Sequence, residues 1–95
     1  MIQSFADEAT ADVFRERNTK AARTIPQDLR RVVQRKLKML DVAARLDDLE
    51  SPGNRLKALK GSIKGRHSVR VNDQYRVTLR WESGHGFEVA VEDYH

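Results

Sequence analysis

The chain has 95 residues, 39% of them apolar and 34% charged, with no cysteine and a formal net charge of +4 at pH 7. These values indicate one small globular domain and exclude a disulfide framework or thiolate metal sites, so we expect a reducing, cytoplasmic environment. No apolar run is long enough for a membrane span, residues 1–5 lack the basic start of a signal peptide, and the positive charge favours a polyanionic partner.

The first half of the chain predicts a short strand and two helices. Residues 1–5 are expected to form the strand, and a helix capped by Asp7 should follow over about 7–17. A second helix should begin at Thr24-Ile25-Pro26, with Thr24 as the capping hydroxyl. Its apolar stripe recurs at helical spacing: Leu29, Val32, Val33, Leu37, Leu40 and Ala44. Its opposite face is basic, and is either solvated or in contact with RNA or a partner protein: Arg30, Arg31, Arg35 and Lys38.

The second half predicts a basic loop and then a sheet. After a turn at 51–54, Leu56 and Leu59 should anchor a loop that extends to about residue 65. From residue 68 the apolar period changes to two, which predicts an antiparallel meander over about 68–72, 75–81 and 87–92. The helices must cover its apolar face, so we predict an α+β fold with the helices on one side of the sheet. That face should bury these side chains: Val69, Val71, Tyr75, Val77, Leu79, Trp81, Phe87, Val89 and Val91.

The face of the sheet opposite the helices should be strongly charged. Arg76 and Arg80 alternate with apolar residues on one strand, and Glu88 and Glu92 follow on the next. These side chains form either cross-strand ion pairs on a solvated surface or part of a phosphate-binding surface. Between positions 55 and 76 the chain has a single acid, Asp73, and this excess of positive charge favours the second interpretation. The basic residues of this stretch are Arg55, Lys57, Lys60, Lys64, Arg66, Arg70 and Arg76.

The last strand ends in groups that can move or orient protons. Asp93, Tyr94 and His95 supply a carboxylate, a phenol and an imidazole. Because the apolar alternation before them should anchor the strand in the core, we expect these groups to be held in place. His67, in the basic loop, is expected to be exposed, with substitution for the proton-transfer group as the alternative, and His85 is expected on the surface of a turn. The three histidines are too scattered for a zinc site.

Three motifs occur in order along the chain. They are the leucine–lysine–glycine step at 56–61, the turn from asparagine to arginine at 72–76, and the terminal Asp93-Tyr94-His95. Together, at this spacing, they resemble the HigB toxins of the RelE superfamily. The resemblance covers residues 1–95 as a single domain and implies the microbial ribonuclease-like α+β fold, whose sheet face opposite the helices binds RNA.

The resemblance also implies a function. The chain would be the toxin of a type II toxin–antitoxin system, an endoribonuclease that cuts messenger RNA in the A site of the 70S ribosome, with contacts to 16S rRNA. Its partners would be a HigA-like helix-turn-helix antitoxin and, through the antitoxin, operator DNA. No metal, cofactor or membrane is expected. The alternative is a basic RNA- or ribosome-binding module without catalysis, or a co-repressor that acts mainly in the antitoxin complex.

The site residues follow from the same resemblance. Asp93, Tyr94 and His95 match the catalytic tail of the family, and Arg76 and Lys60 match its cationic transition-state stabilisers. Lys57 stands where some members have a catalytic histidine, so the general base is left open between Lys57, Asp93 and His95. The remaining basic residues of the loop and sheet are expected to bind RNA: Arg55, Lys64, Arg66 and Arg70.

Overall fold

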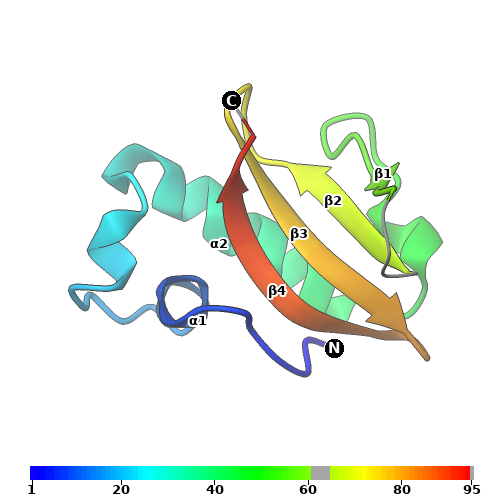
Figure 1. The fold of residues 1–95 in the computed structure, drawn as a ribbon, viewed down its shortest axis with the longest axis horizontal. Helices are drawn as coiled ribbons and strands as arrows, with labels where there is room; N and C mark the ends of the chain where they lie inside the picture. The colour runs from blue at the N-terminus through cyan, green and yellow to red at the C-terminus, as the bar shows by residue number, and fades with distance from the viewer. Residues whose placement is uncertain (61–64, 95) are drawn as a thin grey trace.

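The protein is described by a computed structural model that covers residues 1–60 and 65–94. Two α-helices precede a four-stranded antiparallel sheet in the order β1-β2-β3-β4. Helix α2 crosses behind the sheet, α1 lies beside β4, and the other sheet face is left uncovered (Figure 1). The predicted α+β architecture is therefore confirmed. The elements are α1 (Glu8–Phe14), η1 (Ala22–Thr24), α2 (Gln27–Val42), η2 (Leu46–Leu49), β1 (Lys57–Ala58), β2 (Arg66–Arg70), β3 (Tyr75–Glu82) and β4 (His85–Asp93).

The helices form where the pattern predicted, with different ends. The side chain of Asp7 caps α1 by accepting a hydrogen bond from the Thr10 amide at 2.8 Å, as expected. Helix α1 ends at Phe14 and not at residue 17, since Glu16 takes a left-handed φ of 58° that a helix cannot contain. The predicted cap at Thr24 is wrong, because its hydroxyl donates to the carbonyl of Ala21 inside η1.

The core lies between α2 and the inner face of the sheet. Val33, Leu37 and Leu40 are fully buried on α2, against Val77 and Val89 of the sheet. Ala44, predicted as the last core residue of the helix, is exposed. Helix α2 ends at Val42 and the backbone then becomes extended, so that Ala43 takes the buried position instead.

Two segments at the edges of the sheet differ from the prediction. Residues 1–5 do not form a strand, but run beside β4 through isolated parallel bridges of Ile2 with Gly86 and Phe5 with Val89. The predicted loop after residue 54 contains β1, which pairs Lys57 with Ser68 of β2. A two-residue strand has too little periodicity to be detected in a sequence, and its backbone pairing with β2 is what forms it.

A bulge in β4 reverses the facing of one predicted core residue. Thr78 pairs with Ala90, but Arg80 pairs with Phe87, and Glu88 adopts a φ of 53° between them. Phe87 therefore lies on the outer face beneath Arg80, whose guanidinium carbon is 4.6 Å from the ring centroid. The prediction that Phe87 faces the core is wrong, because strict alternation fails across an inserted residue.

Gly86 takes the inward position that Phe87 was expected to occupy. A Cβ atom there would lie 2.9 Å from Cδ2 of the buried Leu40. We expect Gly86→Ala to lower the free energy of unfolding by about 1–3 kcal/mol through overpacking. Urea denaturation would measure the change, with Gly53→Ala as the matched control, since a Cβ at Gly53 meets nothing within 4 Å. Equal stability of the two variants would contradict the prediction.

Candidate active site

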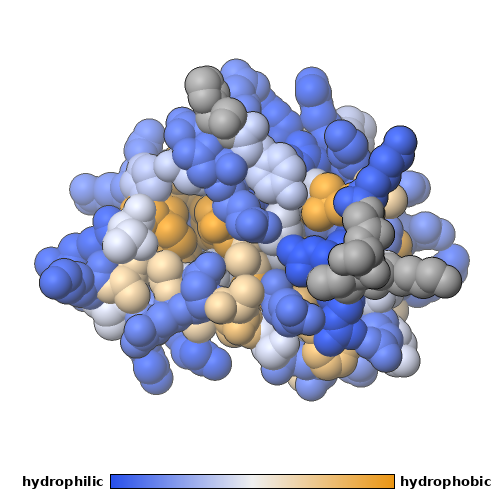
Figure 2. Space-filling view, in the orientation of Figure 1, coloured by the Kyte–Doolittle hydropathy of each residue, from blue (hydrophilic) through white to orange (hydrophobic). Residues whose placement is uncertain are grey.

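The uncovered face of the sheet has a centre of short side chains between charged rows. Hydrophilic residues cover most of the surface seen from this side (Figure 2). Ser68, Thr78 and Ala90 are buried although they point away from the helices, which shows that the longer neighbours cover them. The strand register defines the rows as Lys57, Ser68, Thr78 and Ala90 in the centre, Arg70, Arg76 and Glu92 toward the tail, and Arg66, Arg80 and Phe87 toward the β3–β4 turn.

Arg76 is held on this face by hydrogen bonds to neutral groups of β2 and of the turn before β1. Its Nε donates to the hydroxyl of Ser68 and its Nη2 to the carbonyl of Arg55, each at 2.7 Å. Burial lowers the pKa of Arg76, and the nearby phenol of Tyr94 acts in the opposite direction. Among the described residues no hydrogen bond involves Nη1, so an oriented N–H group is available to an anion.

The tail divides between the two faces of the sheet. Tyr94 is 49% exposed, and its amide donates to the carbonyl of Gln74 at 2.7 Å, which fixes the chain just after β4. Asp93 pairs with Tyr75, which is on the same inner face of β3 as Val77. The Asp93 carboxylate accepts a hydrogen bond from the Gln74 side chain at 3.1 Å. The phenol of Tyr94 is near Arg76, while Asp93 has the facing of Tyr75 on the other side of the strand. His95 lies outside the described residues.

The predicted catalytic lysines lie in or next to β1, and the predicted RNA-binding arginines lie on β2 and just before β1. Lys57 is exposed in β1 and shares the outer face with Ser68, and Lys60 is exposed just beyond the same strand. Arg70 lies beside Arg76 and forms an ion pair with Asp73. Arg66 is half-buried on β2, Arg55 is exposed just before β1, and Lys64 lies outside the described residues.

Glu92 reaches the centre of the face from β4. Its Oε2 accepts a hydrogen bond from the hydroxyl of Thr78 and lies 3.8 Å from Nη2 of Arg66. Arg66 and Glu92 therefore meet over the buried Thr78 from opposite sides. The sequence placed Glu92 on this face as an ion-pair partner or as part of a phosphate-binding surface. It assigned no role to Thr78 and Ser68, although the period of two already placed both hydroxyls on the outer face.

A buried polar contact supports the site from behind. Asn54 is 1% exposed, and its side-chain oxygen accepts a hydrogen bond from Nζ of Lys36, which is 9% exposed on α2. Burial lowers the pKa of Lys36, and the neighbouring Arg35 and Arg70 lower it further. The carbonyl of Asn54 also accepts from the Arg70 amide at 2.6 Å. These contacts hold the turn that presents the carbonyl of Arg55, at a φ of 43°, to Arg76.

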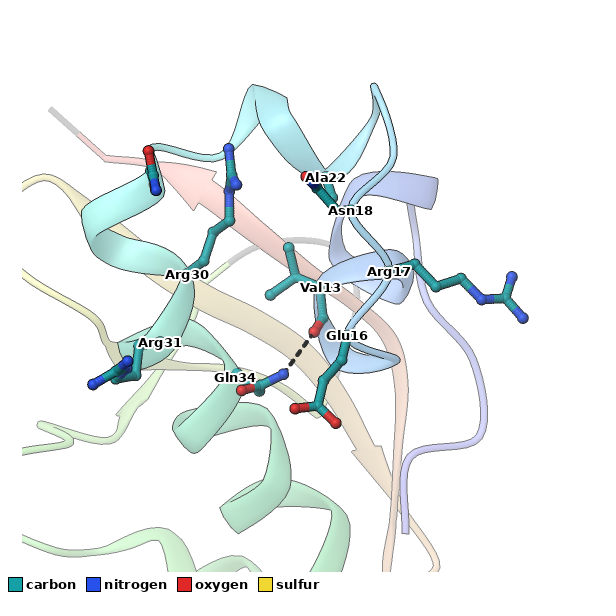
Figure 3. A pocket seen from close by; sticks show the side chains of 9 residues that line it. Val13, Glu16, Arg17, Asn18, Ala22, Arg30, Arg31 and Gln34 are labelled. Carbon is teal, nitrogen blue, oxygen red and sulfur yellow. Dashed lines mark hydrogen bonds between the residues drawn. The ribbon is translucent and has the colours of Figure 1, made fainter.

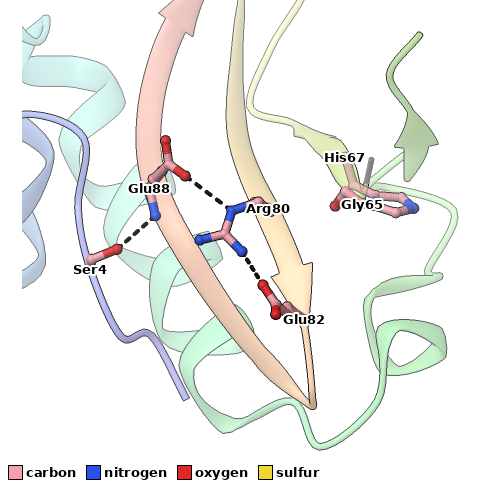
Figure 4. A network of polar contacts seen from close by, with 6 residues as sticks. All are labelled: Ser4, Gly65, His67, Arg80, Glu82 and Glu88. Carbon is pink, nitrogen blue, oxygen red and sulfur yellow. Dashed lines mark hydrogen bonds and ion pairs between the residues drawn. The ribbon is translucent and has the colours of Figure 1, made fainter. Parts of the chain in front are cut away.

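A second charged cluster lies toward the β3–β4 turn. Arg80 donates to Glu88 at 3.0 Å and also pairs with Glu82, and the Glu88 amide donates to the Ser4 hydroxyl at 2.9 Å (Figure 4). Of the two alternatives that the sequence left open for this face, the cross-strand ion pair is the one observed for Arg80 and Glu88. His67, expected to be exposed, is half-buried because it lies in β2 in register with the core residue Leu79, and it contacts the Gly65 carbonyl at 2.9 Å. This cluster anchors the β4 bulge and the N-terminal segment, and its arginine is occupied by carboxylates.

The pocket drawn in Figure 3 lies elsewhere, between the end of α1 and the start of α2. Its volume is about 330 Å³ and its lining includes Arg17, Arg30 and Arg31. The side chain of Gln34 donates to the Val13 carbonyl at 3.2 Å across its base (Figure 3). None of the predicted site residues lines it.

Within residues 1–60 and 65–94, no group of three histidine, aspartate or glutamate side chains is placed to hold a metal ion. Over the same residues, no helix combines the length and the apolar character that crossing a membrane requires.

Comparisons with known proteins give one consistent result. The sequence model for the HigB-like toxin, a RelE-like toxin of type II toxin–antitoxin systems, matches residues 3–95. Toxin HigB-1 of Vibrio cholerae is 44% identical over 66 residues, which span 68% of this chain and 70% of that protein. Endoribonuclease HigB of Proteus vulgaris is 30% identical over 95 residues, the whole of both chains.

Solved structures share the fold at low sequence identity. The YoeB dimer of Staphylococcus aureus has a TM-score of 0.61 and 15% identity, over 99% of this chain and 97% of that one. A YoeB–YefM complex from the same organism has a TM-score of 0.60 and 15% identity, over 100% and 98% of the two chains. This likeness confirms the predicted RelE-like fold.

Proposed function

This chain belongs to the HigB-like family of RelE-like toxins of type II toxin–antitoxin systems, and we propose from this that it cuts messenger RNA in the A site of translating ribosomes. One relative matched over its whole length is named an endoribonuclease. The observation that carries the proposal is Arg76, which two hydrogen bonds fix on an uncovered basic sheet face beside Tyr94.

The chemistry that this face supports is cleavage by the neighbouring 2′-hydroxyl. Such cleavage needs a base for the 2′-hydroxyl, an acid for the 5′-oxygen and cations for the charged phosphorane. Arg76 supplies the oriented N–H groups, and Lys57 and Lys60 supply further positive charge. The family motif supports Tyr94 and His95 as the groups that deliver or position the proton of the leaving group. With side chains in these roles, we propose a reaction that needs no metal.

The proposed partners follow from membership of a toxin–antitoxin family. An antitoxin of HigA-like, helix-turn-helix type would neutralise the chain in the cytoplasm, and the pair would bind operator DNA through the antitoxin. On the 70S ribosome, the basic residues that flank the site would contact the RNA phosphates and 16S rRNA: Arg55, Lys64, Arg66 and Arg70.

The test is cleavage of a defined message on purified 70S ribosomes. We expect the chain to cut at the codon in the A site, in the presence of EDTA at a concentration that leaves ribosomes intact, and to leave a 2′,3′-cyclic phosphate and a 5′-hydroxyl. Primer extension would map the cut, and a message with a single 2′-deoxy nucleotide at that position is the matched control. Binding of ribosomes without cleavage would favour the alternative, a module that binds RNA without catalysis.

A further inference from the structure

We propose that Glu92 is the general base that removes the proton from the 2′-hydroxyl of the substrate. This role rests on the proposed function, ribonucleolytic cleavage. The sequence left the base open between Lys57, Asp93 and His95, and Glu92 is not one of these three. Glu92 stands in register with Arg76, the residue that would stabilise the phosphorane. The two residues are cross-strand neighbours with side chains on the same face, so a phosphate held by Arg76 would lie within reach of the Glu92 side chain.

The carboxylate of Glu92 has one oxygen held and one oxygen available. The Thr78 hydroxyl and Nη2 of Arg66 both contact Oε2. Among the described residues no hydrogen bond or ion pair involves Oε1. The side chain is 47% exposed, so a substrate lying on the face can reach it. Thr78 is fully buried and cannot follow the carboxylate into solvent, which gives the free oxygen a defined direction.

The other acidic groups near the face are less suited to this role. Glu88 and Glu82 both bind Arg80, at the end of the sheet remote from the tail. Asp93 has the inward facing of its partner Tyr75. Lys57 carries no carboxylate, and the ammonium form of a lysine has donors but no acceptor atom. Glu92 is therefore the carboxylate that the strands place between the cations of the face.

The reaction is a transesterification. The 2′-hydroxyl proton passes to Oε1 of Glu92, the 2′-oxygen attacks phosphorus, and the bond from phosphorus to the 5′-oxygen breaks. The leaving 5′-oxygen takes a proton from the acid at the tail, so that the products are a 2′,3′-cyclic phosphate and a 5′-hydroxyl. Glu92 then returns its proton to water, while Arg76 balances the charge that develops on the phosphoryl oxygens.

The experiment compares Glu92→Gln with Glu88→Gln in single-turnover cleavage of ribosome-bound message. Glutamine keeps an oxygen that can accept from Thr78, but cannot take a proton. We expect Glu92→Gln to cleave about 10²–10⁴-fold more slowly, and Glu88→Gln to stay within about threefold of the wild-type rate.

A substrate with sulfur in place of the bridging 5′-oxygen separates the base from the acid. Thiolate leaves without protonation, so this substrate should restore cleavage by an acid-deficient variant such as His95→Ala, but not by Glu92→Gln. If Glu92 only paired with Arg66, its loss would free that arginine for phosphate. Glu92→Gln would then bind uncleavable 2′-deoxy message more tightly and retain cleavage, and this result would overturn the proposal.

Controls separate the role of Glu92 as base from the proposed ribonuclease function. In Glu92→Gln, the Tm and the affinity for 2′-deoxy message should be at least those of the wild type. If the fall in cleavage rate were accounted for by lower stability or weaker binding, the role of base would also be overturned. If the wild type and Glu92→Gln cleaved the normal message and the 5′-thio message at similar rates, the role of Glu92 as base would be refuted and the proposed function would stand. Failure of the wild type on both substrates would refute the proposed function and, with it, the base.

Discussion

Replacing Arg76 by alanine should slow single-turnover cleavage of ribosome-bound message by about 10²–10³-fold, because a pre-oriented donor to the phosphorane is lost. The guanidinium is held by the Ser68 hydroxyl and the Arg55 carbonyl before substrate arrives. Arg76→Lys should recover little of the rate, since an ammonium group cannot reproduce these two contacts and still direct a further N–H to phosphate.

The matched control is Arg70→Ala, on the same face and in register with Arg76. Arg70 is proposed to contact RNA phosphate, so its loss should weaken binding of message. Because its guanidinium is paired with Asp73, we expect little change in the rate at saturation. Rates measured over a range of toxin concentrations would separate the two effects. Arg76→Ala with a saturated rate within about threefold of wild type would show that Arg76 takes no part in the transition state.

Asn54→Ala should lower the free energy of unfolding by about 2–3 kcal/mol, because the buried ammonium of Lys36 loses its acceptor. The same change removes the hydrogen bonds from the Asn54 amide to the Leu49 carbonyl and to the Met39 sulfur, each 3.0 Å long. Urea denaturation would measure the loss. Asn18→Ala, at an exposed position, is the control and should change stability by less than about 0.5 kcal/mol.

The double variant tests whether the cost comes from the unpaired charge. Lys36→Met replaces the ammonium by an apolar side chain of similar length, so Asn54→Ala should cost clearly less in that background than in the wild type. An identical cost in both backgrounds would show that the Lys36 contact contributes nothing. Because this turn carries the Arg55 carbonyl, Asn54→Ala should also slow cleavage at temperatures where the variant is folded.

Residues with strong periodicity were predicted correctly, and those whose position depends on other strands were not. The stripe from Val33 to Leu40 on α2 and the alternation on β3 were sufficient to predict two layers and a charged outer face. Phe87 was misplaced because a bulge inserts a residue into β4, and nothing in the local sequence distinguishes that insertion from continued alternation. β1 exists through its pairing with β2, a contact between distant parts of the chain.

The sequence by itself determined the fold class, the basic face, and the family, because each of these depends on composition, period and motif spacing. The tertiary structure decided which groups share one site. The tail reads as a single unit, yet successive residues of a strand point to opposite faces, so Tyr94 joins Arg76 while Asp93 does not. Glu92, one residue earlier, meets Thr78 and Arg66 at the centre of the face. That meeting joins residues from three strands, and it is fixed by register, which only the folded chain defines.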